Sequence, residues 1–408
     1  MPHRPMEGVR VLEVAQWTFT PSAGGVLADW GADVIKVEHA VTGDAQRGMI
    51  ALGLNEVGDV AFGPIMEHPN RGKRSIGLAI EEPDGLEVLY AIARTSDVFL
   101  TNFLPSARRR LKIDVDDIRA QNPDIVYVRG SAHGPTGPEA ENGGFDDCTF
   151  WTRTGHAAGV TPPGTAGLCH MPAPAYGDSI GGMTIAGGIS AALFARERTG
   201  EPSVVDVSLL STGVWASALS IDLALVTGEP WTPSPIEANV ATNPLAGRFR
   251  TSDDRWIVLT MLQPGRYWAD ACRHLDREDL IVDPRFDTPE NLMANAAEAG
   301  GLIADEIRKR PFAEWRERFR TLEGQWGAAQ NSFEVAHDEQ VRAAGLIRPV
   351  VDVTGTPREL VANPVQFDTT PPDLRRAPQF AEHTDEVLAE LGLSEERILE
   401  LKINGSIT

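Results

Sequence analysis

One acidic residue combines a carboxylate with surroundings that suit nucleophilic chemistry. Asp178 stands in the segment YGDSIGGMTIAGGISAALFARERTG, which covers residues 176–200. Because Asp is a preferred N-cap residue, the segment predicts a helix that begins at Asp178 and runs to about Arg198. Gly181 and Gly182 follow closely, although a glycine inside a helix costs about 1 kcal/mol relative to alanine.

Two explanations of Asp178 fit these residues. As an N-cap, it would stabilise the helix by about 1 kcal/mol. As a nucleophile, it would attack an acyl carbon, and Gly181 and Gly182 would leave room for the acyl group beside bare backbone N–H donors. In both cases the start of the helix favours the ionised carboxylate. The segment alone leaves both explanations open.

A second pair of acids, Asp146 and Asp147, stands in GGFDDCTFW. Neighbouring positions on a helix do not face each other, so these two are not an acid–base pair by spacing. One of them is expected to cap a short helix around residues 147–155. For Asp146 we also consider a role in shaping the substrate pocket.

Basic residues cluster in the first third of the chain, next to expected strand ends. Lys73 and Arg74 precede a strand, Arg108–Arg110 follow NFLPSA, and Arg129 ends a strand. Open α/β sheets bind ligands at the carboxyl ends of their strands, and Arg suits phosphate. The pattern indicates a phosphate-binding site, and the alternative is a set of solvated surface arginines.

Composition excludes several classes of protein. The net charge is −21, which disfavours nucleic acid as a partner. The three cysteines are scattered, and Cys169 with His170 does not make a zinc site, so we expect no metal. No apolar run of membrane-spanning length and no apolar signal core at the N-terminus are evident. We therefore expect a cytoplasmic protein without a membrane partner.

The elements that must position these residues alternate between strand and helix. Strand-like runs at 9–15, 33–38, 74–80, 97–103 and 125–134 are separated by helical stretches. The pattern predicts an α/β fold, with a Rossmann-like large domain and a mostly parallel sheet. An NAD-dependent oxidoreductase is one alternative, but QWTFTPSAGG replaces the glycine fingerprint after the first strand. We therefore expect no nicotinamide cofactor.

Two boundaries follow from changes in pattern. Residues 1–225 and 336–408 are expected to form the large domain, and residues 226–335 a smaller α+β domain. A hairpin is predicted to turn at Asp253-Asp254, and TDEVLAELGLSEERILELKING predicts a pair of helices near the C-terminus.

Several sequence blocks, in order, resemble the class III CoA-transferases, the group that includes formyl-CoA transferase, carnitine CoA-transferase and the α-methylacyl-CoA racemases. These blocks are MEGVRVLEV, LADWGADVIKVE, TGDAQRG, NRGKRSIGL, SDVFLTNFLPSARRRL, NPDIVYVRGSAHGPTGP, GDSIGGMTIAGGISAALFARERTGEPSVVDVSLL and HTDEVLAELGLSEERILEL. The resemblance covers nearly the whole chain, and the GDSIGG block is its most specific part.

The resemblance implies that Asp178 attacks an acyl-CoA thioester, forming a mixed anhydride and then an aspartyl-CoA thioester. The Gly181 and Gly182 positions match the family's pattern, and Asp146 matches an acidic position of the family. Coenzyme A enters as part of the substrate, and the partners are an acyl-CoA, a carboxylic acid and a second copy in an interlocked homodimer. The positions that match the family's CoA contacts are His39, Arg47, Lys73, Arg74, Leu78, Asn102, Phe103, Arg110 and Arg129.

Some positions depart from the family. Phe145 stands where the racemases carry a His, which favours a transferase over the rival acyl-CoA racemase or isomerase. Thr18 and His39 replace a Gln and an Arg of formyl-CoA transferase, so oxalate and formate are not the expected substrates. Four aromatic residues are expected to line a larger, less polar acyl pocket: Trp17, Phe19, Phe150 and Trp151. A non-catalytic CoA-binding protein is a further alternative.

Overall fold

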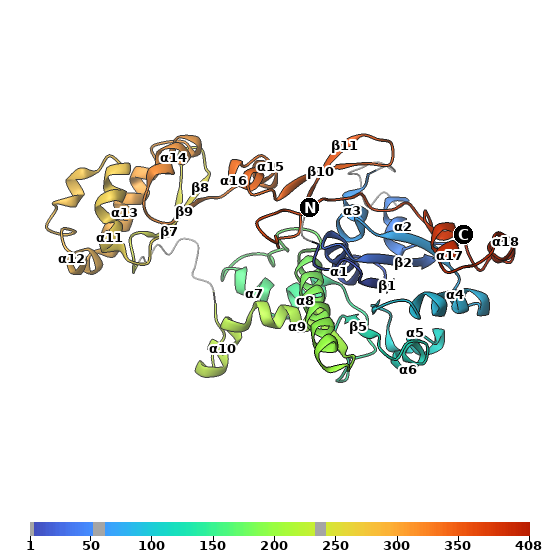
Figure 1. The fold of residues 1–408 in the computed structure, drawn as a ribbon. Helices are drawn as coiled ribbons and strands as arrows, with labels where there is room; N and C mark the ends of the chain where they lie inside the picture. Colours follow the sequence, from blue (N-terminus) through green and yellow to red (C-terminus); the bar gives the residue numbers. More distant parts are fainter. Residues whose placement is uncertain (1–3, 52–61, 233–241) are drawn as a thin grey trace. The chain divides into compact units, whose positions relative to one another are not determined.

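A computed structural model describes residues 4–51, 62–232 and 242–408 (Figure 1). The chain divides into two compact units, one of residues 1–233 with 339–408 and one of residues 234–338. The limits of 226–335 expected for the small domain lie slightly before those of the second unit.

The large unit contains a six-stranded sheet in which all neighbouring strands are parallel. The strand order is β3-β2-β1-β4-β5-β6, the order of the doubly wound dinucleotide-binding fold, which reverses between β1 and β4. The predicted α/β class with a parallel sheet is therefore confirmed. The strands are β1 (Arg10–Val14), β2 (Asp33–His39), β3 (Arg74–Leu78), β4 (Val98–Thr101), β5 (Val126–Ser131) and β6 (Val204–Ser208).

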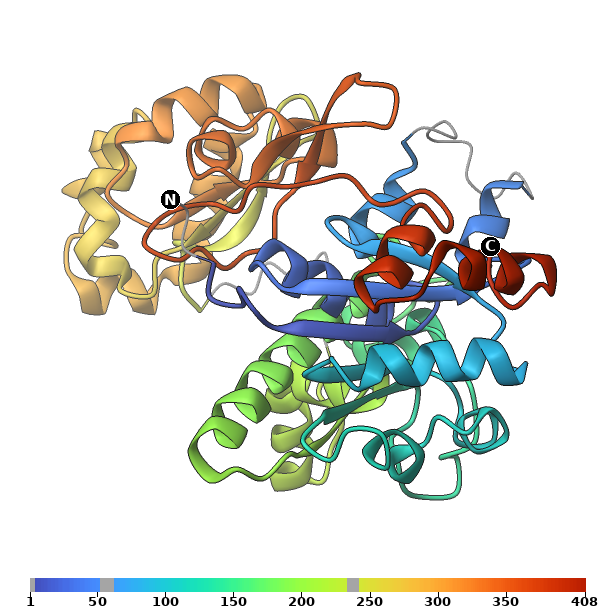
Figure 2. The same cartoon turned by 45° about the vertical axis from the view of Figure 1, so that its right-hand side comes forward.

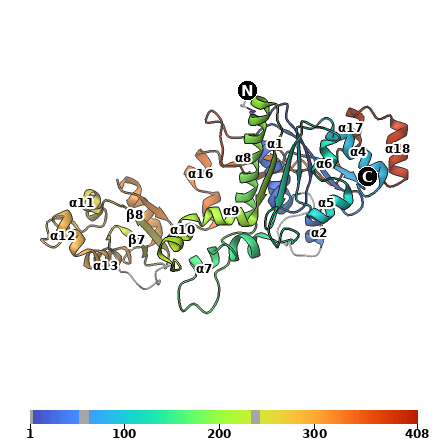
Figure 3. The same cartoon turned by 90° about the horizontal axis from the view of Figure 1, so that it is seen from below.

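Both faces of this sheet are covered, as its nearly continuous apolar strands require. Side chains alternate along each strand, so Val98 and Leu100 of β4 belong to one hydrophobic core while Phe99 between them belongs to the other. Helices α1 and α8 cover the first face, and α4, α6, α17 and α18 contribute to the core on the second (Figures 2 and 3).

The helices of the large unit begin and end as follows: α1 (Phe19–Asp29), α2 (Ala45–Ala51), α3 (Pro64–Asn70), α4 (Pro83–Ala93), α5 (Pro105–Leu111), α6 (Val115–Arg119), α7 (His156–Val160), α8 (Tyr176–Thr199), α9 (Leu209–Ala216), α10 (Ala218–Thr227), α16 (Glu339–Ala343), α17 (Thr384–Glu390) and α18 (Glu395–Ile403). The expected helix at 147–155 is instead a π-helix, η1 (Asp147–Thr152), and α7 begins after Gly155. Gly155 has a φ of 89°, a left-handed conformation that separates the two elements.

The C-terminal segment returns to the large unit. It forms an antiparallel pair, β10 (Ile347–Val351) and β11 (Pro357–Val361), and then the predicted helical pair α17 and α18. Close to the end of the chain, Ile407 pairs with Leu78 at the end of β3. The last residues therefore lie beside the outer strand of the sheet.

The small unit has its own hydrophobic core and an antiparallel sheet of three strands, β7 (Ala246–Arg250), β8 (Trp256–Thr260) and β9 (Trp326–Ala328). The predicted hairpin is confirmed, and Asp254 takes the left-handed conformation in its turn. The helical elements are α11 (Pro264–His274), η2 (Glu278–Ile281), α12 (Pro289–Ala294), α13 (Ala296–Ile307), α14 (Phe312–Arg318), η3 (Phe319–Thr321) and α15 (Ser332–Ala336).

Helix α8 is long and apolar enough to cross a membrane by composition, and α9 with α10 would pass the same test together despite a bend of 69°. The apolar character of α8 has a structural explanation, because Ile185 and Ile189 pack into the core that α1 shares with the sheet.

Candidate active site

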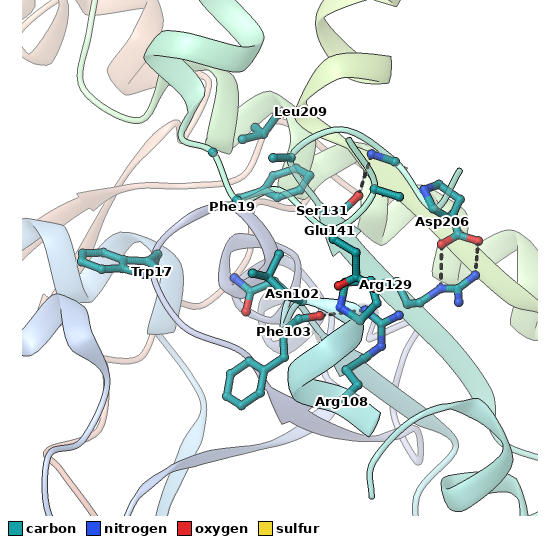
Figure 4. Close-up of a pocket in the computed structure, with 18 of the residues that line it drawn as sticks. Trp17, Phe19, Asn102, Phe103, Arg108, Arg129, Ser131, Glu141, Asp206 and Leu209 are labelled. Atoms are coloured by element: carbon teal, nitrogen blue, oxygen red, sulfur yellow. Dashed lines mark hydrogen bonds and ion pairs between the residues drawn. The ribbon is translucent and has the colours of Figure 1, made fainter. Parts of the chain in front are cut away.

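A large cavity of about 740 Å³ lies at the carboxyl edge of the parallel sheet (Figure 4). Trp17 and Phe19 come from the segment after β1, and Asn102 and Phe103 from the segment after β4. The cavity therefore opens where the strand order reverses, the place at which open α/β sheets bind ligands. Its remaining lining is Leu104, Pro105, Arg108, Arg109, Asp114, Arg129, Ser131, Ala132, Gly134, Pro135, Ala140, Glu141, Gly143, Gly144, Phe145, Cys148, Asp178, Asp206 and Leu209.

Asp178 lines this cavity from the first turn of α8. The helix begins at Tyr176, two residues earlier than expected, so Asp178 is not the N-cap residue. Ala175 holds the N-cap position in a left-handed conformation, with a φ of 57° and no side-chain hydrogen bond to cap the helix. The prediction that Asp178 caps the helix is therefore wrong, and its carboxylate is not committed to capping.

The pKa of Asp178 is raised to about 7, first by burial and second by the negative charge of Asp146. The expected effect of the helix start, which favours the ionised form, does not decide the net direction of this shift. A helix N-terminus contributes at most about 2 kcal/mol to ionisation. Loss of water and a neighbouring carboxylate both oppose ionisation, and here they outweigh it.

Asp146 is the residue that faces Asp178. It is buried, at the N-cap position of η1, and makes no capping hydrogen bond. Burial raises its pKa, while the backbone N–H groups of Asp147, Asp178 and Gly177 act to lower it. Two acids from separate elements thus form one coupled carboxylate pair. Sequence spacing does not reveal this pair, because the two acids belong to separate elements that only the fold brings together.

Gly181 and Gly182 are buried and face helix α1. A Cβ atom on Gly181 would collide with the ring of Phe19, and one on Gly182 would collide with Ser22. Both glycines are therefore explained by the close approach of α8 to α1, whereas the sequence suggested that they make room for an acyl group. Residues three and four positions apart share a helix face, so Asp178 lies on the side of α8 that faces the start of α1.

His68 of α3 also contacts the first turn of α8, and sequence analysis did not single it out. Its Nε2 atom is 3.0 Å from the hydroxyl of Ser179, which in turn donates to the carbonyl of Ala175. Burial, with a smaller effect of Arg71, lowers the pKa of His68 to about 4. A neutral imidazole therefore contacts Ser179, the residue that directly follows Asp178.

The predicted CoA-contacting residues fall into three groups. Asn102, Phe103 and Arg129 line the large cavity. A second hollow of about 280 Å³ is lined by four of the predicted positions, His39, Leu78, Phe103 and Arg110, with Val14, Gln16, Val37, Ile80, Glu81 and Leu111. Phe103 belongs to both linings, so the two hollows adjoin at this residue.

The third group lies away from both hollows. Arg47 makes an ion pair of 2.7 Å with Glu38, and Arg74 binds Asp33 and residues of α17. The side chain of Lys73 is fully buried, and its ammonium group binds both carboxylate oxygens of Glu13. These three cations line neither hollow, and they form ion pairs inside the large unit.

Arg129 shows how the cavity charges are balanced. Its guanidinium binds both carboxylate oxygens of Asp206 at 2.7 Å, across neighbouring positions of β5 and β6 (Figure 4). Arg108 binds Asp114 at 3.1 Å and the carbonyl of Phe103 at 2.7 Å. Both arginines are therefore neutralised locally before any ligand enters.

Two of the four aromatic residues expected in an acyl pocket lie elsewhere. Phe150 and Trp151 are buried, and their rings stack on His156. Only Trp17 and Phe19 of that set line the cavity. Thr18, in the loop between them, donates its hydroxyl to Gln46.

Within residues 4–51, 62–232 and 242–408, no group of three or more His, Cys, Asp or Glu residues is arranged to hold a metal ion.

Comparison with known proteins places the chain in a family. The model of CoA-transferase family III matches residues 6–384. An (R)-2-hydroxy-4-methylpentanoate CoA-transferase of Clostridioides difficile is 27% identical over 97% of this chain and 98% of its own length. A cinnamoyl-CoA:phenyllactate CoA-transferase of Clostridium sporogenes is 29% identical over 97% and 95%, respectively.

The fold agrees with this placement. A CAIB/BAIF family protein from Brucella suis superimposes with a TM-score of 0.77 over 95% of this chain and 100% of its own, at 24% sequence identity. At that identity the likeness supports the fold alone.

The raised pKa of Asp178 predicts a pH-dependent effect of Asp178→Asn on stability. The folded-state pKa of about 7 lies above the ordinary value of 3.8, so the stability that Asp178 contributes is present at low pH and lost as pH rises through about 7. Asn resembles the protonated carboxyl at every pH. We expect the variant to match the parent near pH 4 and to be more stable than it at pH 8, measured by urea unfolding.

The exposed neighbour Asp147 provides the control. Because Asp147 is exposed, any gain in stability of Asp147→Asn at pH 8 should be smaller than that of Asp178→Asn. An Asp178→Asn difference that stays constant or shrinks toward pH 8 would contradict the assigned shift.

Proposed function

The chain belongs to CoA-transferase family III, and from this premise we propose that it moves CoA between an acyl-CoA and a free carboxylic acid with Asp178 as the nucleophile. The observation that carries the proposal is a carboxylate with a raised pKa in a cavity at the carboxyl edge of the sheet. The names of the two clostridial relatives, both CoA-transferases, support the same reaction class.

The proposed reaction balances without an oxidant, a metal or a net proton. The ionised carboxylate of Asp178 attacks the thioester carbonyl, the C–S bond breaks, and CoA leaves as a thiolate. The thiolate then attacks the Asp178 carbonyl of the mixed anhydride and releases the first acid as its carboxylate. The acceptor acid attacks the resulting aspartyl-CoA thioester, and the same steps in reverse give the new acyl-CoA.

The Asp146–Asp178 pair supports this role for Asp178 by its electrostatics. A partly buried carboxylate near a second acid is poorly stabilised as an anion. Acylation removes the negative charge of Asp178, and with it the burial cost and the repulsion by Asp146. The covalent intermediate is therefore favoured relative to the free carboxylate, which is the effect a nucleophile requires.

We further propose that CoA occupies the two adjoining hollows. Among the described residues, the guanidinium of Arg110 in the second hollow has no hydrogen bond or ion pair with another protein group. It is exposed and available to a phosphate, and a phosphate contact of Arg is a strong, charge-assisted interaction. The apolar residues Val37, Leu78 and Ile80 beside it suit a flat, partly apolar group.

The main experiment follows isotope exchange between an acyl-CoA and the ¹³C-labelled form of its own acid, read by mass spectrometry. Asp178→Ala should abolish exchange, because the variant lacks the carboxylate on which the proposed anhydride forms. Hydroxylamine added during turnover should convert Asp178 of the parent to a hydroxamate. Cys148→Ser, which removes the thiol in the same cavity, should retain exchange and the hydroxamate.

Two outcomes would overturn the transferase proposal. One is unchanged exchange by Asp178→Ala. The other is rapid exchange of the Cα hydrogen for deuterium in deuterated water without an acceptor acid, the activity of the rival racemase.

For the CoA site, we expect Arg110→Ala to raise KM for the acyl-CoA about tenfold or more, because a charged hydrogen bond contributes roughly 1.5–3 kcal/mol. The value of kcat should change little, since Arg110 lies in the second hollow and Asp178 in the first. The control is Arg94→Ala, which removes an exposed arginine paired with Glu87. Equal effects of the two variants on KM would count against this site.

We also propose that the chain forms a homodimer. Helix α10 buries none of its residues, and α9 and α10 present exposed apolar side chains, among them Trp215 (81% exposed), Leu225 (78%) and Val226 (85%). Contiguous apolar patches of this kind mark interaction sites. Light scattering should give a molar mass near twice the 44.1 kDa of one chain, and a monomer mass at micromolar concentration would contradict the proposal.

A further inference from the structure

Trp17 is held in a conformation that a large side chain rarely adopts. Its φ is 69°, which lies in the left-handed region. A bulky residue is strained in this conformation, and the surrounding structure must hold it there. Such outliers cluster at ligand sites, where the surrounding structure enforces them. The question for this chain is what Trp17 does in the large cavity.

Hydrogen bonds fix the backbone on both sides of Trp17. The N–H of Trp17 donates to Asp44 at 3.2 Å. The N–H of Gln16 donates to the side chain of Asn102 at 3.1 Å, and the amide of Asn102 donates back to the carbonyl of Gln16 at 2.7 Å. The hydroxyl of Thr18 donates to Gln46. The loop after β1 is therefore tied to the segment after β4, to Asp44 before α2 and to the first turn of α2.

The carboxylate of Asp44 that holds Trp17 is itself anchored. Its second oxygen lies 2.8 Å from the ammonium group of Lys36, and both side chains are fully buried. Burial acts to lower the pKa of Lys36, but Asp44 and other carboxylates raise it well above its usual range, so the pair is ionised. A buried ion pair between Lys36 of β2 and Asp44 thus fixes the position of a strained tryptophan in the cavity wall.

The indole ring of Trp17 meets Phe145 from the opposite wall. The two rings pack edge to face, with centroids 5.4 Å apart and an interplanar angle of 88°. Both residues line the cavity with Asp178, and Phe145 remains 58% exposed. Phe145 directly precedes Asp146, the partner of Asp178, and lines the same cavity as Asp178.

The cavity has a polar side as well. In Figure 4, Trp17 projects on one side of Asn102, while Arg129 and Asp206 lie on the other. This pair of charged groups is thus separated from the indole. An acyl substituent that extends from Asp178 toward Trp17 and Phe145 would contact the two aromatic rings and would not contact Arg129 or Asp206.

We propose that Trp17 and Phe145 determine the acyl specificity, and that the enzyme acts on acids whose acyl part carries a bulky apolar group, aryl or branched aliphatic. Small acids such as acetate leave the aromatic pair without a contact and gain nothing from it. This inference rests on the proposed CoA-transferase function and adds the class of its substrates.

The test compares two identity exchanges with the intact protein. One pairs 3-phenylpropionyl-CoA with ¹³C-labelled 3-phenylpropionate, and the other pairs acetyl-CoA with ¹³C-labelled acetate. We expect kcat/KM to be at least about tenfold higher for the phenylpropionyl pair, since one apolar pocket commonly discriminates by roughly 10–200-fold. In Trp17→Ala this ratio should fall about tenfold, and Trp17→Phe should restore most of it.

Phe145→Ala keeps the test decisive if Trp17→Ala fails to fold. Phe145 is largely exposed, so its removal leaves no void in the core. It should lower the same ratio. A parent enzyme that prefers acetate, or a ratio unchanged in both alanine variants, overturns the specificity proposal while exchange itself upholds the transferase. Absence of exchange and of an Asp178 hydroxamate with either donor overturns the proposed function, and this inference with it.

Discussion

The candidate site depends on a set of charges buried beneath the carboxyl edge of the sheet. Glu13 of β1, Lys36 of β2 and Lys73, which precedes β3, bring three fully buried charged side chains together. Lys73 binds both oxygens of Glu13, and Lys36 binds Glu13 at 3.3 Å and Asp44 at 2.8 Å. Loss of one member would leave an unpaired buried charge, at a cost of roughly 3–5 kcal/mol. Through Asp44, this network also holds the loop that carries Trp17.

A second constraint sets the position of Asp178. Helix α8 approaches α1 closely because Gly181 and Gly182 have no side chains to collide with Phe19 and Ser22. The same helix face carries Asp178. Asp178 lies one turn before these glycines, where burial and the charge of Asp146 raise its pKa. The raised pKa means that the native state tolerates an unfavourable anion at this position, as expected where function opposes stability.

Sequence reasoning predicted what repeats along the chain. The alternation of strands and helices led to the parallel sheet, and strand ends led to Arg129, which lines the cavity. Asn102 and Phe103, which line it as well, followed only from the family resemblance. Sequence reasoning failed where a contact joins distant segments. The pairing of Asp146 with Asp178 and the contact of His68 with Ser179 have no local signature.

Lys73 illustrates the same limit for charge. A lysine before a strand suggests a ligand contact. Here β1 and α1 pack against the side chain of Lys73 and bury it, and no local sequence pattern reveals that packing. Its pKa is lowered to about 8 by burial, although Glu13 acts to raise it. The lysine is therefore part of the framework under the site.

The net charge of −21 then has a specific consequence for an anionic substrate. Most cations near the two hollows are already neutralised, Arg129 by Asp206 and Arg108 by Asp114. Attraction of a phosphate group therefore cannot come from the overall field, which is repulsive. It must come from a cation whose charge is not already balanced, and Arg110 meets that requirement among the described lining residues of the second hollow. The electrostatic attraction of a CoA ester would consequently be local and short-ranged. Apolar contacts would supply the rest of the binding free energy.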